Sequence, residues 1–309
     1  SVCLSDRFSC KERSKSVQSS CLMEFNRIID KQDMPSLCCC PRTLAKQLTC
    51  IELRLIRGIC RDDLLQGCKT NSATSVSKNY SDYVHWCNRL GTLVDTQLTM
   101  CTNKRRRRRR MLTNYLLDVA MECISIGNFN SAIIILIRLD MSPASKMHGL
   151  WAEHNWSYFS KMKHLIDPNK NFSNYRAYLQ VAKDRAETDE NVTDKIFIPY
   201  FELLMKDLYV ADDVSSRSSK DSGDLTFQIE RSIHYLEIWK KAQCSFKEIP
   251  IIIEYLESDV ILDRSCQVHL LQSESLTPCG SNSRSEQTSA RLAEPINWIR
   301  RKVDHLFSQ

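Results

Sequence analysis

Glycine and proline are so scarce in this sequence that folds rich in turns are excluded. Seven glycines and eight prolines occur among 309 residues, about 5 % of the chain where average usage gives roughly 12 %. Sandwiches, barrels and glycine-rich nucleotide folds need many more turn residues than this. Because 42% of the residues are hydrophobic, the chain is also able to form a core. The composition therefore predicts an all-α globular fold.

The net charge of +6 comes from one short basic stretch, Lys104 and Arg105 to Arg110. The rest of the chain is close to neutral. Nucleic-acid-binding domains usually spread their basic residues over a face or along a helix, so no nucleic-acid partner is expected. We interpret the run first as a solvated basic loop. Contact with phosphate groups or an acidic membrane surface, and nuclear targeting, are the alternatives.

The fifteen cysteines are unusual in number and spacing. Cys38, Cys39 and Cys40 are adjacent, which makes them poor disulfide partners for one another. No Cys-x-x-Cys pair occurs, so the spacing of structural zinc sites is missing. Residues 1–20 are polar and lack the apolar segment of a signal peptide. We therefore expect reduced thiols, a cytoplasmic location and no bound metal.

Apolar residues recur at helical spacing in six segments: 43–65, 83–98, 112–126, 130–139, 196–210 and 225–242. Gly127 and Asn128 are typical of a helix C-terminus. Residues 130–139 are apolar on nearly all sides, which predicts a helix buried at the centre of the domain. The last two segments flank a serine-rich connection and predict a helical hairpin.

Catalytic motifs are missing from the sequence. There is no glycine-rich phosphate loop, no His-Glu-x-x-His and no nucleophile elbow. His148, His154 and His164 are close in sequence but do not have metal-ligand spacing. The residues alone indicate an all-α cytoplasmic interaction domain without a cofactor.

Several stretches, in family order, resemble the catalytic domain of Ras-family guanine nucleotide exchange factors (RasGEF domains). They are Leu44–Thr49 with Glu52, Gly127–Ser131, Met141–Pro143 with Lys146 and Trp151, Ile198–Leu208, and Leu225–Phe227. The small "family member 1" group of RasGEF-domain-containing proteins is more similar still. That resemblance is carried by Tyr83–Trp86 with Asn88–Leu90, Asp167–Pro168, Asn171–Phe172, Asn174–Arg176 and Ile233–Cys244.

The resemblance implies a single all-α RasGEF-type domain with a protruding helical hairpin. Residues 1–39 are then a disordered or truncated lead-in, and residues 40–278 are the RasGEF-like catalytic domain. The hairpin spans about 196–243, and residues 279–309 form a polar loop and a short C-terminal helix. The helical module that precedes the catalytic domain in relatives and braces the hairpin is expected to be absent.

The resemblance also implies exchange without covalent chemistry. RasGEF domains bind the nucleotide-free state of a small GTPase, which lowers the affinity of the GTPase for nucleotide by linkage. Alignment puts the apolar residue that faces Mg²⁺ at Tyr209 and the acidic residue that faces the phosphate loop at Asp213. The alternatives are a core aromatic residue at 209 and a solvated charge at 213.

Further positions are expected to contact the GTPase: Arg57, Asp140, Ser145, His148, Asn171 and Phe172. Arg57 has the alternative of a plain surface charge, while Tyr175 and Arg176 have a structural alternative. Asp140 replaces a family asparagine, so a hydrogen bond that needs a donor would be lost. His148 and Arg138 are also departures from the family pattern.

Two functions follow as expectations. The first is a guanine nucleotide exchange factor for a Ras- or Rap-type GTPase, cytoplasmic and with membrane recruitment through Lys104 and Arg105 to Arg110 as an added possibility. The alternative is an exchange-inactive domain that binds a GTPase or a scaffold partner. Neither needs a cofactor or a metal.

Overall fold

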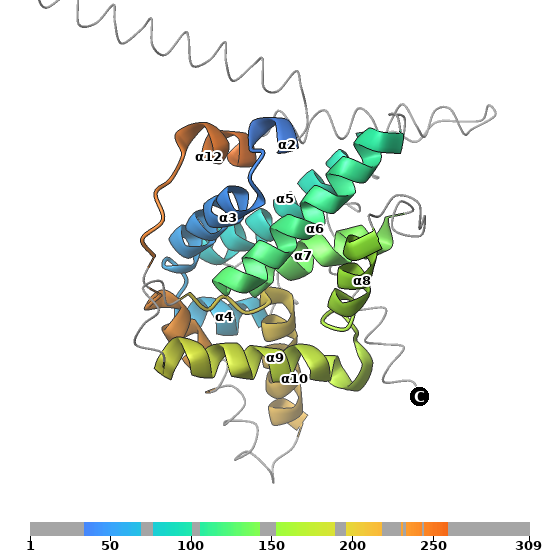
Figure 1. Ribbon diagram of the computed structural model, residues 1–309. Helices are drawn as coiled ribbons and strands as arrows, with labels where there is room; N and C mark the ends of the chain where they lie inside the picture. Colours follow the sequence, from blue (N-terminus) through green and yellow to red (C-terminus); the bar gives the residue numbers. More distant parts are fainter. Residues whose placement is uncertain are drawn as a thin grey trace, which may run out of the picture. The chain divides into compact units, whose positions relative to one another are not determined.

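The computed structural model describes residues 34–68, 77–100, 106–142, 153–188, 196–217, 230, 233–242 and 244–258. Its helices are α2 (Met34–Leu37), α3 (Pro41–Ile56), α4 (Arg61–Cys68), α5 (Lys78–Met100), α6 (Arg106–Ile126), α7 (Phe129–Met141), α8 (Glu153–Met162), α9 (Asn169–Thr188), α10 (Phe201–Arg217) and α12 (Pro250–Glu257) (Figure 1). Residues 233–240 are also helical. The described ranges contain no strand, which confirms the all-α prediction.

Helix α7 forms the centre of the core, as its apolar sequence predicts. It packs against α5 and α6, and all of its residues from Phe129 to Leu136 are buried. Asn128 caps its N-terminus, accepting a hydrogen bond from the Ser131 N–H at 3.0 Å. Gly127 has a φ of 99°, and a Cβ there would lie 2.1 Å from the Ile196 carbonyl oxygen. The predicted helix end at Gly127 and Asn128 is confirmed.

The predicted helix 196–210 begins later than its apolar sequence suggests. Residues 196–200 are not helical, and Ile198 forms a parallel bridge with Asn128. The Ile198 N–H donates to the Gly127 carbonyl at 2.9 Å, and the Phe129 N–H donates to the Ile198 carbonyl at 2.9 Å. These backbone groups are paired with the turn before α7 and are therefore not used within a helix. Helix α10 begins at Phe201.

The predicted helical stretch 43–65 is divided in two. Helix α3 ends at Ile56 and α4 begins at Arg61. In the turn between them, the Gly58 carbonyl accepts a hydrogen bond from the Asn79 side chain at 2.7 Å. A contact with α5 therefore fixes the direction of the chain at this break.

The domain boundaries expected from the sequence are covered only in part. The end of the predicted lead-in is ordered: Met34–Leu37 form α2, and Met34 is buried. Residues 1–33, the connection of the predicted hairpin and residues 279–309 lie outside the described residues. Helix α10 and the helix at 233–240 overlap the two segments that were predicted as arms, and the hairpin itself stays a prediction.

A buried carboxyl group joins two of the sequence motifs. Glu52 of α3 is fully buried, and it accepts hydrogen bonds from the side chains of Tyr83, Asn128, Asn130 and Ser131. Burial raises the pKa of Glu52, while the four donors act in the opposite direction. Glu52 thereby fixes α3 to the turn that begins α7.

Candidate functional site

The start of α10 is held by buried polar contacts. The Phe201 N–H donates to the Asn130 side-chain oxygen at 3.1 Å, and the Tyr200 N–H donates to the Tyr175 hydroxyl at 2.7 Å. Burial raises the pKa of Tyr175 above its ordinary value, so this hydroxyl stays neutral. Because these contacts come from α7 and α9, the first turn of α10 is fixed to both helices.

A bidentate ion pair between Arg176 and Asp207 holds one side of α10 against α9. Arg176 of α9 donates from both terminal nitrogens to the two carboxylate oxygens of Asp207, each at 2.7 Å. Both side chains are mostly buried, with exposed fractions of 28% and 22%. Paired contacts of this kind fix geometry as well as adding energy. They set the rotation of α10 about its own axis.

Helix α9 begins with a left-handed turn that contacts α10. Lys170, Asn171 and Phe172 have φ values of 50°, 55° and 58°, a conformation that side-chain-bearing residues rarely adopt. The Asn171 carbonyl accepts from Arg176 Nε at 2.8 Å, and its side-chain oxygen accepts from Lys206 Nζ at 3.1 Å. The predicted contact residues Asn171 and Phe172 therefore lie beside the helix that carries Tyr209.

Tyr209 is exposed on α10. Its exposed fraction is 52%, so the alternative of a core aromatic residue is wrong. Asp213 lies about one helical turn further along the same helix, and its side chain is outside the described residues. The helix thus carries both predicted exchange positions.

The other predicted contact residues fall into three groups. Arg57 is exposed in the turn between α3 and α4, and α4 packs against α10. Asp140, near the end of α7, forms an ion pair with Lys163 at 2.8 Å. Ser145 and His148 lie outside the described residues.

The departure at Arg138 is accommodated inside the fold. Its guanidinium pairs with Asp95 at 2.8 Å and fills the space beside Gly91, where a Cβ would lie 2.8 Å from the Arg138 terminal nitrogen. A side chain at position 91 would therefore require the end of the Arg138 side chain to move. Arg138 is a structural residue of the α5–α7 contact.

Sequence reasoning missed the residues that position the site. Lys206, Asp207 and Glu52 were identified only as matches to family motifs. Their role in positioning other residues was not predicted. Their partners are 31 to 79 residues away in sequence, so no local pattern indicated them. Arg176 next to the predicted contact residues was the one available signal.

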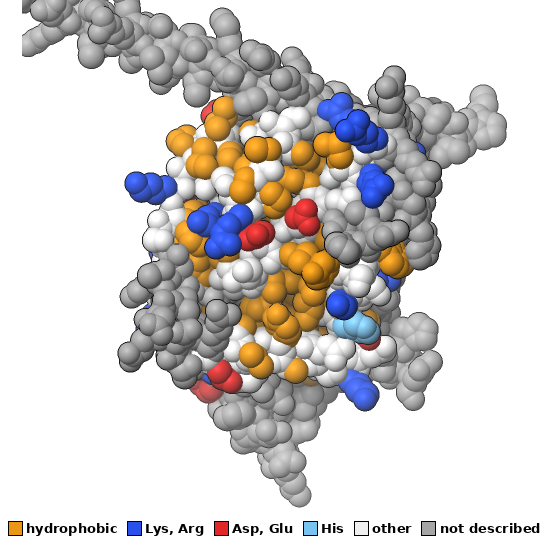
Figure 2. Space-filling view, viewed as in Figure 1, with side chains coloured by type: hydrophobic (Ala, Val, Ile, Leu, Met, Phe, Trp, Pro, Cys, Tyr) orange, Lys and Arg blue, Asp and Glu red, His pale blue; other side chains and the backbone are white. Residues whose placement is uncertain are grey.

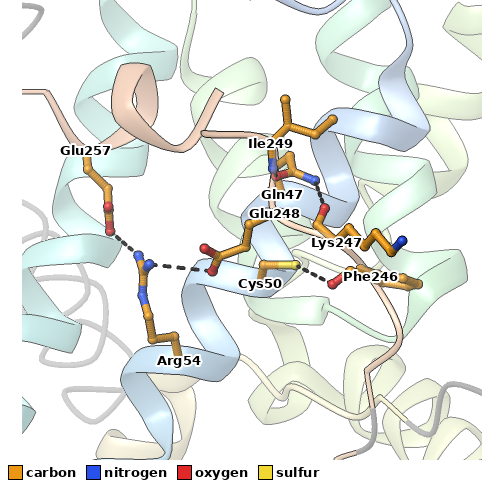
Figure 3. Close-up of polar contacts among 8 residues, drawn as sticks. All are labelled: Gln47, Cys50, Arg54, Phe246, Lys247, Glu248, Ile249 and Glu257. Carbon is orange, nitrogen blue, oxygen red and sulfur yellow. Dashed lines mark hydrogen bonds and ion pairs between the residues drawn. The ribbon is translucent and has the colours of Figure 1, made fainter. Parts of the chain in front are cut away.

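A segment after the second predicted hairpin arm crosses α3; we call residues 244–258 the α12 strap. The side chain of Gln47 on α3 forms two hydrogen bonds with the backbone of the strap. It donates to the Lys247 carbonyl at 3.0 Å and accepts from the Ile249 N–H at 2.7 Å (Figure 3). Arg54 forms ion pairs with Glu248 and Glu257. The strap therefore packs on the side of α3 that carries Gln47 and Arg54, three residues before Arg57.

In the ranges that the structure describes, no group of three His, Cys, Asp or Glu side chains is placed to hold a metal ion. The same ranges contain no helix with the length and apolar character needed to span a bilayer.

The profile of the RasGEF domain family matches residues 43–239. This chain belongs to the RasGEF family.

Curated relatives of this RasGEF domain are members of the group that the motifs indicated. Ras-GEF domain-containing family member 1B of Mus musculus is 33% identical over 242 residues, which are 74% of this chain and 50% of the relative. Family member 1C of Macaca fascicularis is 31% identical over 272 residues, 84% of this chain and 58% of the relative. Family member 1A of Xenopus tropicalis is 33% identical over 239 residues, covering 73% of this chain and 50% of the relative.

These matches confirm the resemblance to the family and to its "family member 1" group. The chain spans about half the length of the curated relatives it matches. Membership supports a role in Ras-type nucleotide exchange and a small GTPase as the general class of partner.

Proposed function

We propose that this protein accelerates GDP release from a Ras- or Rap-type small GTPase by stabilising the nucleotide-free state. The observation that carries the proposal is the exposure of Tyr209 on a helix that buried contacts hold at its start and along its side. A helix that displaces a ligand from another protein must keep its position while it contacts that protein. The contacts of α10 meet that requirement.

The proposed mechanism is competition rather than covalent chemistry. A bulky side chain at 209 would exclude Mg²⁺ from the GTPase, and a carboxylate at 213 would occupy the donors that hold phosphate. Tight binding to the nucleotide-free GTPase lowers its affinity for GDP and GTP by the same factor. No cofactor or metal of the exchange factor itself takes part.

The proposed GTPase-binding surface extends from α10 to the residues beside it. Asn171 and Phe172 support it because they lie in the left-handed turn that Lys206 and Arg176 hold against α10. Strained backbone of this kind is concentrated at functional sites. Arg57 is proposed as a contact because it is exposed next to α4, and Ser145 and His148 are proposed from the resemblance alone.

One observation favours a second function, binding without exchange. Asp140 is an acceptor only, and its carboxylate is already paired with Lys163 at 2.8 Å. The family asparagine would offer a donor to the GTPase. If this loss is limiting, the domain binds a GTPase or scaffold partner and releases little nucleotide.

The deciding experiment measures release of a fluorescent GDP analogue from a panel of Ras and Rap GTPases. Accelerated release from at least one GTPase is expected for the exchange factor. No acceleration, together with retention of a nucleotide-free GTPase in a pull-down, would favour the second function. Asp140→Asn should then raise the release rate, and an unchanged rate would exclude Asp140 as the cause.

The role of Tyr209 has its own test. Tyr209→Ala is expected to lower the release rate at saturating GTPase by about tenfold or more, because the side chain acts in the state that excludes Mg²⁺. Affinity for the GTPase should fall less. The matched control is Tyr158→Ala on α8, another exposed tyrosine (45%), which should leave both quantities unchanged. An equal loss of binding and release would make Tyr209 only a packing contact.

We propose a cytoplasmic location for this activity, since Ras- and Rap-type GTPases would be met there. This follows from the proposed partner and from the many free thiols, including Cys38, Cys50, Cys87 and Cys123 in the core.

A further inference from the structure

Two features of the sequence are not used by the proposed exchange site: the three adjacent cysteines and the arginine run. The structure places both of them close to the first half of α6. Cys38–Cys40 connect α2 to α3, and the Cys38 carbonyl accepts a hydrogen bond from the Tyr115 hydroxyl of α6. Tyr115 follows Arg110 by five residues, about 7.5 Å along the helix axis. Helices α2 and α3 both pack against α6, as Figure 1 also shows.

Two cysteines of this turn differ from the core cysteines in exposure, and one of them, Cys40, also differs in the direction of its pKa shift. Cys39 and Cys40 are exposed. The pKa of the Cys40 thiol is lowered by the Thr43 hydroxyl and then by the Thr43 N–H, since Cys40 stands at the N-cap of α3. Burial instead raises the pKa of the Cys87 and Cys123 thiols. At a given pH, a larger fraction of Cys40 than of these core thiols is therefore thiolate, the nucleophilic form.

The arginine run forms the first turns of α6, so the structure assigns helix rather than loop to Arg106–Arg110. Arg107, Arg108 and Arg110 are exposed, and Met111 beside them has an exposed fraction of 59%. Figure 2 shows basic side chains next to hydrophobic ones at this end of α6. Positive charge is unfavourable at a helix N-terminus, so nearby anions would stabilise this end of the helix.

Among the described residues, two acidic side chains, Asp118 and Glu122, lie further along α6 than the arginines. Glu122 of α6 is paired with Arg42 at 3.6 Å. The pKa of Asp118 is raised by burial and then by Glu122, which disfavours its charged form. Lys46 adds a further positive charge on α3. The surface is therefore basic, partly apolar and equipped with two exposed thiols.

We propose that Cys39 and Cys40 are a site of S-acylation by a long-chain fatty acyl group, and that the acylated turn and the arginines of α6 together bind an acidic lipid bilayer. One acyl chain alone gives only marginal membrane binding, and a basic patch is the kind of second signal that makes it stable. Acidic phospholipids supply the negative charge that the arginines attract.

The chemical step is an acyl transfer from acyl-coenzyme A. The Cys40 or Cys39 thiolate attacks the thioester carbonyl, the new sulfur–carbon bond forms, and the bond from that carbon to the coenzyme A sulfur breaks. Coenzyme A leaves as a thiolate and takes up the proton that the cysteine released. No oxidant or reductant is needed.

The modification is tested by labelling cells that express the full chain with an alkyne-tagged palmitate. The expected result is a label that hydroxylamine removes and that C39S/C40S abolishes. Cys60 is also exposed, follows α3 rather than preceding it, and provides the matched control: C60S should keep the label. An unlabelled chain, or a label that survives in C39S/C40S, would overturn the acylation site.

The membrane contact is tested with the full chain and vesicles of phosphatidylcholine with or without phosphatidylserine. R107S/R108S/R110S should weaken binding to the acidic vesicles by about tenfold or more, while R61S on α4 should not. Equal binding to neutral vesicles, or binding to RNA but not to acidic vesicles, would overturn the proposal. Neither the hydroxylamine-sensitive label nor the vesicle binding is a measure of nucleotide release, so both outcomes can be read separately from the exchange activity.

Discussion

At the scale of single residues, the buried carboxyl group of Glu52 is surrounded by four hydrogen-bond donors that need an oxygen acceptor. Both of its oxygens accept hydrogen bonds, and the amides of Asn128 and Asn130 cannot simply reverse. Their own oxygens accept from the Ser131 and Phe201 N–H groups. Glu52→Gln would turn an amide group toward buried donors and leave them unpaired. We expect a loss of about 3 kcal/mol in the free energy of unfolding.

Urea unfolding followed by circular dichroism measures this loss. Glu254→Gln on α12 is the control because Glu254 is exposed, and it should change stability by less than about 0.5 kcal/mol. Similar values for the two variants would mean that the α3–α7 contact does not depend on a full set of acceptors.

At the scale of helices, the Arg176–Asp207 pair makes α9 and α10 one unit. Asp207→Asn should weaken the paired contact and let α10 rotate, so the rate of GDP release should fall more than the affinity for the GTPase. Arg176→Ala should destabilise the fold by about 2 kcal/mol, because the partner carboxylate is left partly buried. A fluorescent GDP release assay and a thermal melt measure the two effects.

The charge-swapped double variant, R176D/D207R, separates positioning from simple loss of charge. It should recover part of the release rate that either single variant loses. Asp184→Asn is the control, since Asp184 lies on the exposed side of α9 and its carboxylate accepts a hydrogen bond from the exposed Gln180 side chain. Full activity in Asp207→Asn would show that other contacts set the rotation of α10.

At the scale of the whole domain, the α12 strap joins its beginning and its end. Gln47 binds the Lys247 carbonyl and the Ile249 N–H, which lie 200 and 202 residues away. Gln47→Ala removes both partners at once. Hydrogen exchange at the Ile249 amide should then become at least about tenfold faster, because the amide loses its acceptor.

The matched control for the strap is Gln66→Ala on α4, where the glutamine is exposed. It should leave exchange at the Ile249 amide unchanged. If Gln47→Ala also leaves that amide protected, the ion pairs of Arg54 with Glu248 and Glu257 are sufficient to hold the strap.

Helix ends and buried helices that depend on residues close together in the sequence were predicted best. The cap at Gly127 and Asn128 and the buried helix α7 follow from a glycine stop and an apolar run, and both were correct. The start of α10 was placed too early because residues 196–200 are as apolar as a buried helix. Their backbone pairs with the turn at Asn128, a tertiary contact that periodicity does not record. Lys206 and Asp207 were missed as positioning residues for the same reason.

The anchoring of α10 has a consequence for the order in which the domain assembles. The side-chain oxygen of Asn130 accepts from the Phe201 N–H, 71 residues later in the sequence. Closing so long a loop costs conformational entropy before the contact can stabilise the fold. On a ribosome, α3 to α7 emerge well before that donor is available. During synthesis, the donor for the Asn130 oxygen therefore becomes available only after α7 has emerged, and the α12 strap, which follows α10 in the sequence, reaches α3 later still.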